Sequence, residues 1–408
     1  MLRLAVIGLG NRAAGVIRMM RDVEPEVQVV AVTSPDRAEV SCRLDKMGIS
    51  SDSVQFHPSE DKLLEFSDNY DGVLIGTRCY LHTSMACKVA PTGLPLYLEK
   101  PVAITAEQLN QLTDAFAGRE ETVLVSFPLR VTPLFATALD IVRSGRLGPI
   151  NQIQANNNVP YGGGYFSEWH RNYDETGGLW LQKTTHDFDY LTHLLDARPL
   201  MIAATATQKI YGGQMPHDLR CSACDQIDTC LESHQHQRLR GDTGGMSTRG
   251  DQHDHLCAFS GEIRNQDAGS ALILYEGGAH VTYAQNFISR RSAAKRGAVI
   301  TGHWATVEFD WYTNVVRVID HMNDRVDEIT VKTSSGHSGG DHELGKNFVQ
   351  IMRGEAQASA NLRDGLLSAA MCLAARESTF SRTFQPIVPP GVKPEELPDV
   401  TSATEIPV

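Results

Sequence analysis

Lys100 stands where a strand of a parallel sheet would end, in the segment Leu98-Glu99-Lys100-Pro101. Open α/β sheets bind their ligands at the carboxyl ends of the strands. A lysine amine at that edge can hydrogen-bond a hydroxyl group undergoing oxidation and stabilise the developing alkoxide charge. Judged from these residues alone, a solvated surface lysine is the simpler interpretation, so a chemical role depends on what the rest of the chain supplies.

A histidine on a later predicted helix is a second candidate for proton transfer. In a helix over residues 179–195, the side chains of Gln182, His186 and Asp189 fall at i, i+4 and i+7 and share one face. Lys183 lies on the neighbouring stripe. An unperturbed imidazole has a pKa of about 6.5, which suits a base at neutral pH. His186 is therefore the main candidate base, oriented by Asp189 or by a substrate hydroxyl, and a satisfied core histidine is the alternative.

The chain opens with a glycine motif, VIGLGNRA, of the form G-x-G-x-x-A. Gly8 permits a tight turn, Gly10 lets a pyrophosphate approach the backbone, and Ala13 lets the next helix pack close to the strand. The helix would begin near Asn11 and Arg12, with free N–H groups and the positive end of its dipole toward the phosphates. We therefore expect a bound dinucleotide at this turn, although a simple turn could share the pattern.

The end of the second predicted strand bears on which dinucleotide binds. An acidic residue about 20 positions beyond the glycine turn usually holds the adenosine ribose hydroxyls. Ser34 occupies that position here, followed by Asp36 and Arg37. A small hydroxyl followed by arginine accommodates a 2′-phosphate, while Asp36 could still reach the ribose, so the sequence favours NADP over NAD by a small margin. The alternative is that Asp36 and Arg37 only cap and decorate the following helix.

A polar, histidine-rich stretch carries four cysteines, Cys221, Cys224, Cys230 and Cys257, with the spacing C-x2-C-x5-C-x26-C. Four thiolates in one segment of a reduced protein are typical of a tetrahedral, structural zinc site. Free buried thiols, a disulfide and an iron–sulfur centre are the alternatives. A nearby histidine could replace one sulfur: His217, His234, His236, His253 or His255.

The elements that position these residues follow from the periodicity of the apolar positions. In the first 125 residues, short apolar runs alternate with helical patterns, which predicts a doubly wound parallel sheet of the Rossmann type with helices on both faces. The strands are expected over residues 2–7, 27–33, 72–76, 94–98 and 122–126, and the helices over residues 13–23, 38–47, 62–66, 83–90 and 106–116.

The second part, residues 126–385, shows successive strands without intervening helices, which predicts an α+β domain with a large, mostly antiparallel open sheet. A cysteine-rich insertion occupies about residues 212–260, and the Pro-rich tail over 386–408 is expected to be an extended strap or disordered. Strands are expected over residues 150–156, 200–208, 269–275, 279–287, 298–301, 305–310, 315–319 and 325–333, and helices over 133–144, 179–195, 341–352 and 363–381.

Composition excludes several classes of partner. The 408 residues are too many for one ordinary hydrophobic core, and their formal net charge of −12 argues against a nucleic-acid partner. No apolar stretch approaches the roughly 20 residues of a membrane span, and the chain starts directly in a strand rather than in a secretion signal. We therefore expect a cytoplasmic protein with no membrane partner, whose eight cysteines stay reduced.

Together with the glycine turn, the Glu99-Lys100-Pro101 segment resembles the signature of the Gfo/Idh/MocA family, which includes glucose-fructose oxidoreductase and inositol dehydrogenase. The resemblance covers nearly the whole chain. Its other landmarks are the loop from Thr77 to His82, where Arg78 and Cys79 replace the family's Pro and Asn, Arg130 in FPLR, the segment SGRLGPI and the late GHSGGD. The cofactor contacts that it implies are Thr77, His82 and Glu99.

The resemblance reverses the interpretation of Lys100, which becomes a catalytic residue beside the nicotinamide and the substrate. In the family, the substrate helix carries an Asp and a His four residues apart. His186 matches the histidine, but Gln182 stands in place of the Asp and cannot accept a proton. By the same analogy, a further set of side chains would line the substrate pocket: Trp169, His170, Arg171, Lys183, Asp189 and Arg130.

We therefore expect an NAD(P)-dependent oxidoreductase that transfers a hydride between nicotinamide and a hydroxyl carbon of a sugar, sugar derivative or cyclitol. His186 would move the hydroxyl proton and Lys100 would polarise the oxygen. The resemblance also implies a homodimer or homotetramer formed through the exposed face of the second sheet. Two rivals stay open: an NAD-dependent glycosidase working through a transient 3-keto intermediate, and a non-catalytic sensor that binds dinucleotide and a protein partner.

Overall fold

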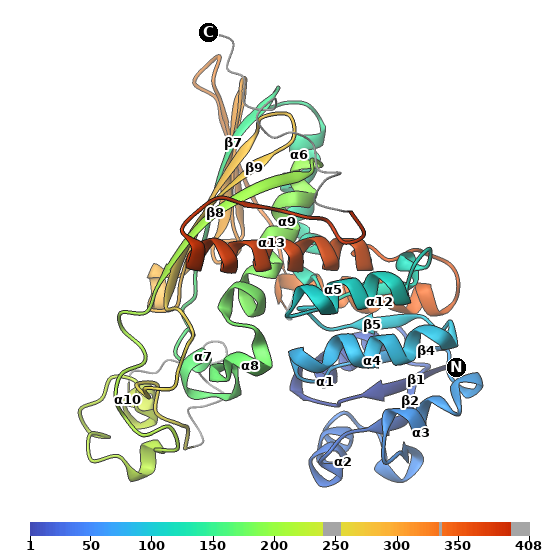
Figure 1. Ribbon diagram of the computed structural model, residues 1–408. Helices are drawn as coiled ribbons and strands as arrows, with labels where there is room; N and C mark the ends of the chain where they lie inside the picture. Colours follow the sequence, from blue (N-terminus) through green and yellow to red (C-terminus); the bar gives the residue numbers. More distant parts are fainter. Residues whose placement is uncertain (240–253, 334–336, 393–408) are drawn as a thin grey trace.

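The computed structural model describes residues 1–239, 254–333 and 337–392, without the side chains of 237–239. Its N-terminal half contains a six-stranded parallel sheet in the order β3-β2-β1-β4-β5-β6, which confirms the predicted doubly wound arrangement (Figure 1). The short β3 was not predicted from the sequence. The strands are β1 (Leu2–Ile7), β2 (Val27–Thr33), β3 (Gln55–Phe56), β4 (Gly72–Ile75), β5 (Leu96–Leu98) and β6 (Val123–Val125).

Helices connect these parallel strands, because a parallel pair requires a crossover connection. α1 packs beside the later helix α12 (Gly340–Met352), and α4 packs against α5. Each element except β3 coincides with a predicted one to within a few residues at its ends. The helices are α1 (Asn11–Val23), α2 (Arg37–Lys46), α3 (Glu60–Leu64), α4 (His82–Val89) and α5 (Ala106–Ala115).

The second sheet has nine strands in the order β14-β13-β12-β11-β7-β10-β9-β8-β15. Every pair is antiparallel except β10 with β7, as expected for a mostly antiparallel open sheet. The start of the predicted tail enters this sheet as β15, and residues 393–408 lie outside the described part. The strands are β7 (Ile150–Asn158), β8 (Pro199–Thr207), β9 (Ala268–Tyr275), β10 (His280–Asn286), β11 (Lys295–Gly302), β12 (Ala305–Asp310), β13 (Val315–Asp320), β14 (Val326–Thr330) and β15 (Gln385–Pro386).

The last two long helices return to the first sheet and join both halves. α12 lies beside α1, whereas α13 crosses from β8 and α9 to β6 and α5. None of the helices in the described residues is both long and apolar enough to cross a membrane. The helices of this part are α6 (Pro133–Arg143), α7 (Gly164–Ser167), α8 (Tyr173–Thr176), α9 (Thr185–Leu195), α10 (His234–Leu239), α12 (Gly340–Met352) and α13 (Leu362–Ser381).

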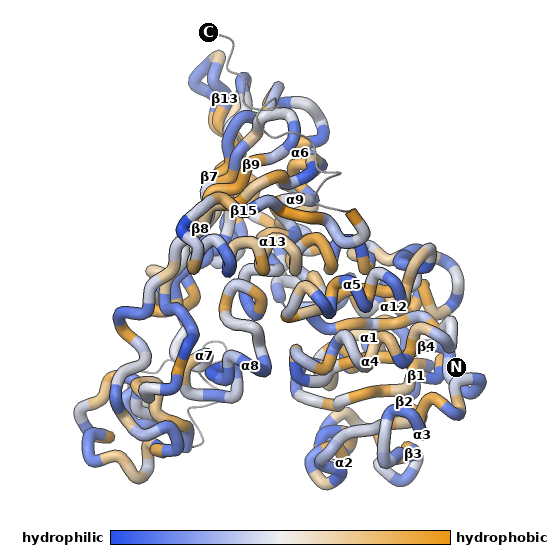
Figure 2. Tube along the Cα trace, viewed as in Figure 1, coloured by the Kyte–Doolittle hydropathy of each residue, from blue (hydrophilic) through white to orange (hydrophobic). Residues whose placement is uncertain are grey.

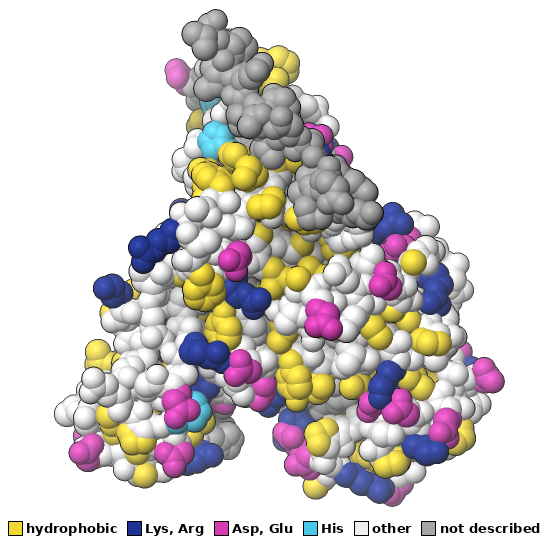
Figure 3. Space-filling view, in the orientation of Figure 1, with side chains coloured by type: hydrophobic (Ala, Val, Ile, Leu, Met, Phe, Trp, Pro, Cys, Tyr) yellow, Lys and Arg dark blue, Asp and Glu magenta, His cyan; other side chains and the backbone are white. Residues whose placement is uncertain are grey.

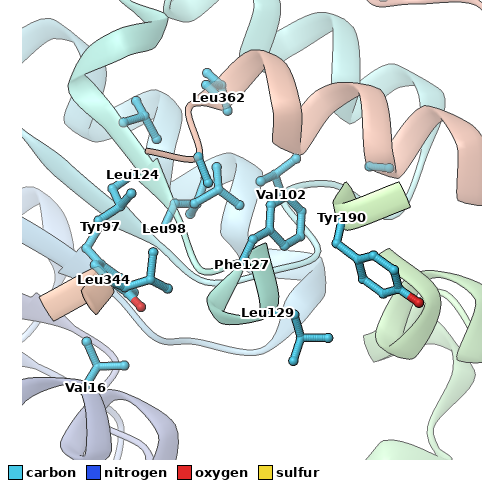
Figure 4. Close-up of a cluster of buried hydrophobic side chains, with 14 of the residues drawn as sticks. Val16, Tyr97, Leu98, Val102, Leu124, Phe127, Leu129, Tyr190, Leu344 and Leu362 are labelled. Atoms are coloured by element: carbon cyan, nitrogen blue, oxygen red, sulfur yellow. The ribbon is translucent and has the colours of Figure 1, made fainter. Parts of the chain in front are cut away.

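One continuous core fixes the two halves to each other. Tyr97 and Leu98 of β5 belong to the same buried cluster as Leu344 of α12, Leu362 of α13 and Tyr190 of α9 (Figure 4). Figure 2 shows the corresponding hydrophobic stretches along β1 and around β7 and β9. The carboxyl end of β5, where Lys100 follows, is therefore held at a fixed position relative to the start of α9.

The expected single α-helix over residues 179–195 is wrong in its first turn. Trp180–Thr184 wind as a π-helix, and the α-helix begins only at Thr185. A π-turn widens the helix and shifts the direction of the side chains before it relative to those after it. Gln182 and His186 therefore do not follow the i, i+4 geometry from which their shared face was predicted.

Candidate functional site

The glycine turn has the geometry that a dinucleotide phosphate requires. Gly8 has a φ of +82°, and a Cβ there would lie 2.7 Å from Cγ2 of Thr77. A Cβ on Gly76 would lie 2.7 Å from that of Ala13, so α1 packs closely against the end of β4. At Gly10 the nearest such contact is 3.7 Å, and no side chain caps the start of α1. The first N–H groups of this 13-residue helix are therefore available to an anion, which fits a dinucleotide.

Arg12 links three elements beside this turn. Its guanidinium lies 2.9 Å from Glu99 and 2.7 Å from Asp341, and it donates to Ser126 Oγ at 3.0 Å. Burial opposes its charge, yet Glu99 and Asp341 raise the pKa of Arg12 above its ordinary value. The side chains of Arg12 and Glu99, both expected to contact cofactor, bind each other and fasten the end of β5 to α1 and α12.

His82 holds together the two loops that face the turn. It is buried, with Nδ1 2.7 Å from the Pro101 carbonyl oxygen and Nε2 3.2 Å from that of Thr77. The Lys100–Pro101 peptide is cis. Because Thr77 packs on Gly8, this histidine positions the cofactor loop and the Lys100 segment from behind, so any contact of His82 with a cofactor would be indirect.

Lys100 is clamped to the π-helix. Its Nζ donates to the main-chain oxygen of Gln182 at 2.6 Å, and the Gln182 side-chain oxygen accepts from the Cys79 thiol at 3.3 Å. Burial lowers the pKa of Lys100 to about 8, although the neighbouring Cys79 and Glu99 act in the opposite direction. Lys100 is thus a lysine that can gain and lose a proton near neutral pH, within reach of the helix that carries His186.

His186 has an environment that the sequence did not reveal. Burial and the positive charges of Lys100 and Arg296 hold its pKa well below the ordinary value. Its Nδ1 is buried without a hydrogen-bond partner, and its ring centroid lies 6.0 Å from that of Phe127 and 6.4 Å from that of His337. The expectation of an imidazole with an ordinary pKa is therefore wrong, because His186 stays neutral at physiological pH and resists protonation.

Asp189 does not orient His186 as expected. Its carboxylate accepts two hydrogen bonds from Arg130, at 2.5 and 3.0 Å, and Arg130 also binds Asp364 at 2.7 Å. Arg130 and Asp189 have side chains only 4% and 1% exposed. A bidentate guanidinium outcompetes a neutral imidazole for a carboxylate. Both residues were expected to contact substrate, and the structure places them in a buried ion-pair network below the site.

The sequence reasoning missed a polar layer beneath Lys183. Lys183 donates to the Tyr161 hydroxyl at 2.7 Å, and burial lowers its pKa. Asp187 accepts from Arg296 Nε at 2.8 Å and from the Tyr283 hydroxyl at 2.9 Å. These side chains come from α9, β10 and β11, so only the sheet brings them together. In the sequence, this polar layer was indicated only by the basic pair at residues 295–296, at the edge of an apolar strand.

The expected substrate loop spans the two halves. The Arg78 guanidinium, after β4, lies 3.9 Å from the Trp169 ring centroid and 3.5 Å from Glu175. The rings of Trp169 and His170 lie 4.0 Å apart, and Arg171 contacts His217 of the insertion at 3.2 Å. Figure 3 shows the molecule hollowed between the lobe that carries α7 and α8 and the lobe that carries the parallel sheet.

Asp36 and Arg37, which follow β2, partly have the helix-capping and surface roles that were the alternative to cofactor binding. Asp36 caps α2 by accepting from the Glu39 N–H at 2.8 Å, and the Arg37 guanidinium lies 4.5 Å from the Phe56 ring centroid. Arg43, which the sequence did not single out, donates to the Leu9 carbonyl oxygen at 3.1 Å. The packing of α2 brings Arg43 to the glycine turn, where its guanidinium is a second cation in addition to that of Arg12.

The four cysteines of the insertion surround one cavity of about 20 Å³, together with His255. All four are free thiols, and Cys221 Sγ lies 3.7 Å from His255 Nε2. Within the described residues, no group of three His, Cys, Asp or Glu side chains already has the arrangement that holds a metal ion. The zinc expectation therefore stays a prediction, and His253 lies outside the described residues.

Two family models match the chain. The model described as the oxidoreductase family with an NAD-binding Rossmann fold matches residues 2–127, and the Gfo/Idh/MocA C-terminal domain matches residues 135–308. Among curated proteins, the chain is 25% identical over 309 residues to the oxidoreductase YteT of Bacillus subtilis (strain 168), covering 66% of this chain and 70% of that protein. It is 26% identical over 144 residues to the inositol 2-dehydrogenase of Rhizobium meliloti (strain 1021), covering 35% and 42%.

Solved structures share the whole fold. An oxidoreductase domain protein from Kribbella flavida superposes with a TM-score of 0.75 at 17% identity, and levoglucosan dehydrogenase, solved with NADH and levoglucosan, with a TM-score of 0.73 at 14% identity. Each covers 95% of this chain and 99% of the solved chain. The chain belongs to the Gfo/Idh/MocA family of oxidoreductases, with an NAD-binding Rossmann domain followed by the C-terminal domain of that family.

Proposed function

We propose that this chain is a dehydrogenase or reductase acting on a CH–OH group of a sugar, sugar derivative or cyclitol. The observation that carries the proposal is Lys100, whose pKa burial lowers to about 8 at the carboxyl end of β5, next to a neutral His186. A bound nicotinamide dinucleotide would accept or supply the hydride there. The relatives named inositol 2-dehydrogenase and levoglucosan dehydrogenase support a polyhydroxylated substrate.

The lowered pKa values of Lys100 and His186 support Lys100, rather than His186, as the group that carries the proton. In the oxidation direction, Lys100 as a free amine accepts the hydroxyl proton of the substrate and becomes an ammonium. In the reduction direction, the ammonium returns that proton to the carbonyl oxygen. His186 stays neutral and offers one ring nitrogen to hydrogen-bond the same oxygen, while the Gln182 carbonyl oxygen holds the Lys100 amine in position. Gln182 thus acts through its main chain and moves no proton.

The direct test is hydride transfer from a panel of sugars and cyclitols, monitored at the nicotinamide absorbance. Mass spectrometry of small molecules released from the purified protein guides the choice of panel. We expect at least one polyol to change the absorbance with the wild-type protein. A cofactor that stays bound while a glycoside is cleaved without net redox change would support the glycosidase instead. Dinucleotide binding with no turnover of any released ligand would support the sensor.

Cofactor choice is tested at Arg37, which follows β2. We expect Arg37→Ala to weaken NADPH binding about tenfold, because one hydrogen bond to a charged group contributes about 1.5 kcal/mol. NADH binding should change less than about twofold, because it has no 2′-phosphate. Fluorescence titration with both cofactors measures this, with Arg21→Ala as a control, since Arg21 binds the Met47 carbonyl oxygen beyond the site. Equal losses for both cofactors would contradict a phosphate role for Arg37.

We also propose self-association through the open face of the second sheet. The face formed by β7 to β10 contains a hollow of about 570 Å³. The side chains on this face alternate with the core-facing row of Ala155, Ala271 and Tyr283, and they are small or polar: Gln154, Asn156, Ala203, Thr205, Ser270, Leu272, Thr282 and Ala284. Hydroxyl and amide side chains can both donate and accept hydrogen bonds, which suits a self-complementary contact between two copies of the sheet.

A further inference from the structure

The insertion between β8 and β9 is a folded segment with little regular structure and a small apolar core. Its described regular structure is α10, a short 3₁₀ turn at Cys221–Ala223 and two isolated bridges, Met215 with Ser260 and Arg220 with Leu256. Apart from two thiols, its buried apolar side chains in the described residues are Tyr211, Ala258 and Ile263, which pack in a small cluster with Phe166 and Phe287. In small free domains, an apolar core of this size is usually supplemented by a cross-link or a metal ion, and the insertion would gain stability from one in the same way.

The four cysteines occupy the position where such a link would act. Cys221 lies in the 3₁₀ turn and Cys224 directly after it, Cys230 precedes α10, and Cys257 lies beside the second bridge. They come from three separate stretches of chain yet line the same cavity of about 20 Å³. A cavity of that size holds a single water-sized particle. All four are free thiols, so a disulfide does not close the segment here.

We propose that Cys221, Cys224, Cys230 and Cys257 bind one Zn²⁺ ion as a tetrahedral, structural site. Binding replaces four S–H bonds by four Zn–S bonds and releases four protons, with no change of oxidation state. Within the described residues no three of these side chains already have a metal-binding arrangement, so the ion would draw the thiols that line the cavity inward on binding. Cys221 then exchanges its 3.7 Å contact with His255 for the metal, and His255 becomes a neighbour of the site.

Hydrogen bonds connect the insertion that carries the proposed zinc site to the predicted substrate loop. Leu256, next to the fourth cysteine, donates its N–H to the Ser167 carbonyl oxygen at 3.3 Å. Asn265 donates its side-chain amide to the carbonyl oxygens of Tyr165 and His170, at 3.2 and 2.9 Å. These bonds join the insertion to the loop that carries Trp169. Metal loss is therefore expected to loosen that loop while leaving the parallel sheet and its dinucleotide turn folded.

The test is metal content of the full-length protein purified without chelator and supplied with zinc. Elemental mass spectrometry should find about one zinc ion per chain in the wild-type protein. We expect less than about a fifth of that zinc in Cys224→Ser and Cys257→Ser. The melting temperature of these variants should fall by at least about 5 °C. Cys42→Ser is the matched control, because Cys42 is exposed on α2, and it should keep both zinc and melting temperature.

A second measurement keeps the proposal falsifiable if a variant folds poorly. Removing the metal from the wild-type protein with a chelator should make the insertion sensitive to limited proteolysis, and adding zinc should restore its protection. NADH binding reports that the first domain stays folded throughout. Eight reduced thiols with no metal and no effect of the chelator would overturn the proposal. So would a mass 2 Da lower, which indicates a disulfide, or bound iron with visible absorbance, which indicates an iron–sulfur centre.

Discussion

Replacing Lys100 with methionine is expected to lower kcat by about 10²–10³-fold while leaving the Kd for NADH unchanged within about twofold. Methionine keeps much of the buried volume but removes the amine that donates to the Gln182 carbonyl oxygen at 2.6 Å. The reacting oxygen then loses both its proton partner and the charge that stabilises an alkoxide. Cofactor affinity should persist, because the glycine turn and the start of α1 supply the phosphate contacts.

The proposed role of Lys100 also predicts the direction in which the oxidation and reduction rates change with pH. The pKa of Lys100, lowered by burial to about 8, predicts that oxidation accelerates as pH rises through about 8, because only the free amine accepts a proton. Reduction should slow over the same range, because the ammonium that donates the proton is lost. His186, with a pKa well below its ordinary value, should contribute no limb near neutrality. In Lys100→Met, the changes of both rates near pH 8 should be absent.

A matched lysine separates this effect from the loss of any positive charge. Lys62→Met removes an exposed lysine that pairs with Glu65 on α3, far from β5 in the sheet, and should leave kcat unchanged. A kcat of Lys100→Met within about threefold of wild type would exclude Lys100 as the proton carrier. A limb that persists at pH 8 in Lys100→Met would assign that titration to another group, and His186→Ala would then be the next variant to measure.

The parts of the fold that the sequence predicted are those set by neighbouring residues. Gly8, Gly10 and Ala13 form a turn whose strand, phosphate approach and helix lie within a dozen positions, so their pattern was sufficient. The long alternation of apolar runs likewise predicted the parallel sheet and the open sheet. Lys100 was different: its neighbours in sequence left it a surface residue, and only the family resemblance placed it at a site.

What the sequence could not show depends on contacts between distant residues. Arg130 and Asp189 are 59 positions apart, and no local pattern announces that they pair. The π-helix is equally hidden, because its residues read as an ordinary helix start. The neutral state of His186 arises from burial and from the charges of Lys100 and Arg296, which only the fold brings near. Sequence reasoning thus selected these residues by type, whereas their hydrogen-bond and ion-pair partners became visible only in the fold.

Replacing Arg130 with methionine is expected to destabilise the protein by about 3–5 kcal/mol. Burial already raises the pKa of Asp189 to about 8 although Arg130 lowers it, so without Arg130 this side chain, 1% exposed, must take up a proton or stay as an unpaired buried carboxylate, and Asp364 would lose its contact at 2.7 Å. Urea unfolding followed by circular dichroism measures the loss. The double variant Arg130→Met, Asp189→Leu should recover much of it, because two apolar side chains leave no buried charge unpaired.

The control is a surface pair of similar geometry. Arg146 binds Asp327 at 2.5 Å with side chains about one third exposed, and Arg146→Met should cost less than about 1 kcal/mol. Measuring KM together with stability also distinguishes the two roles considered for Arg130, which are substrate contact and ion pairing with Asp189. If Arg130→Met keeps its stability but raises KM, Arg130 belongs to the substrate pocket as the sequence suggested. If stability falls while KM holds in the folded fraction, the Arg130–Asp189 pair serves to anchor α9, and through it His186, beneath the site.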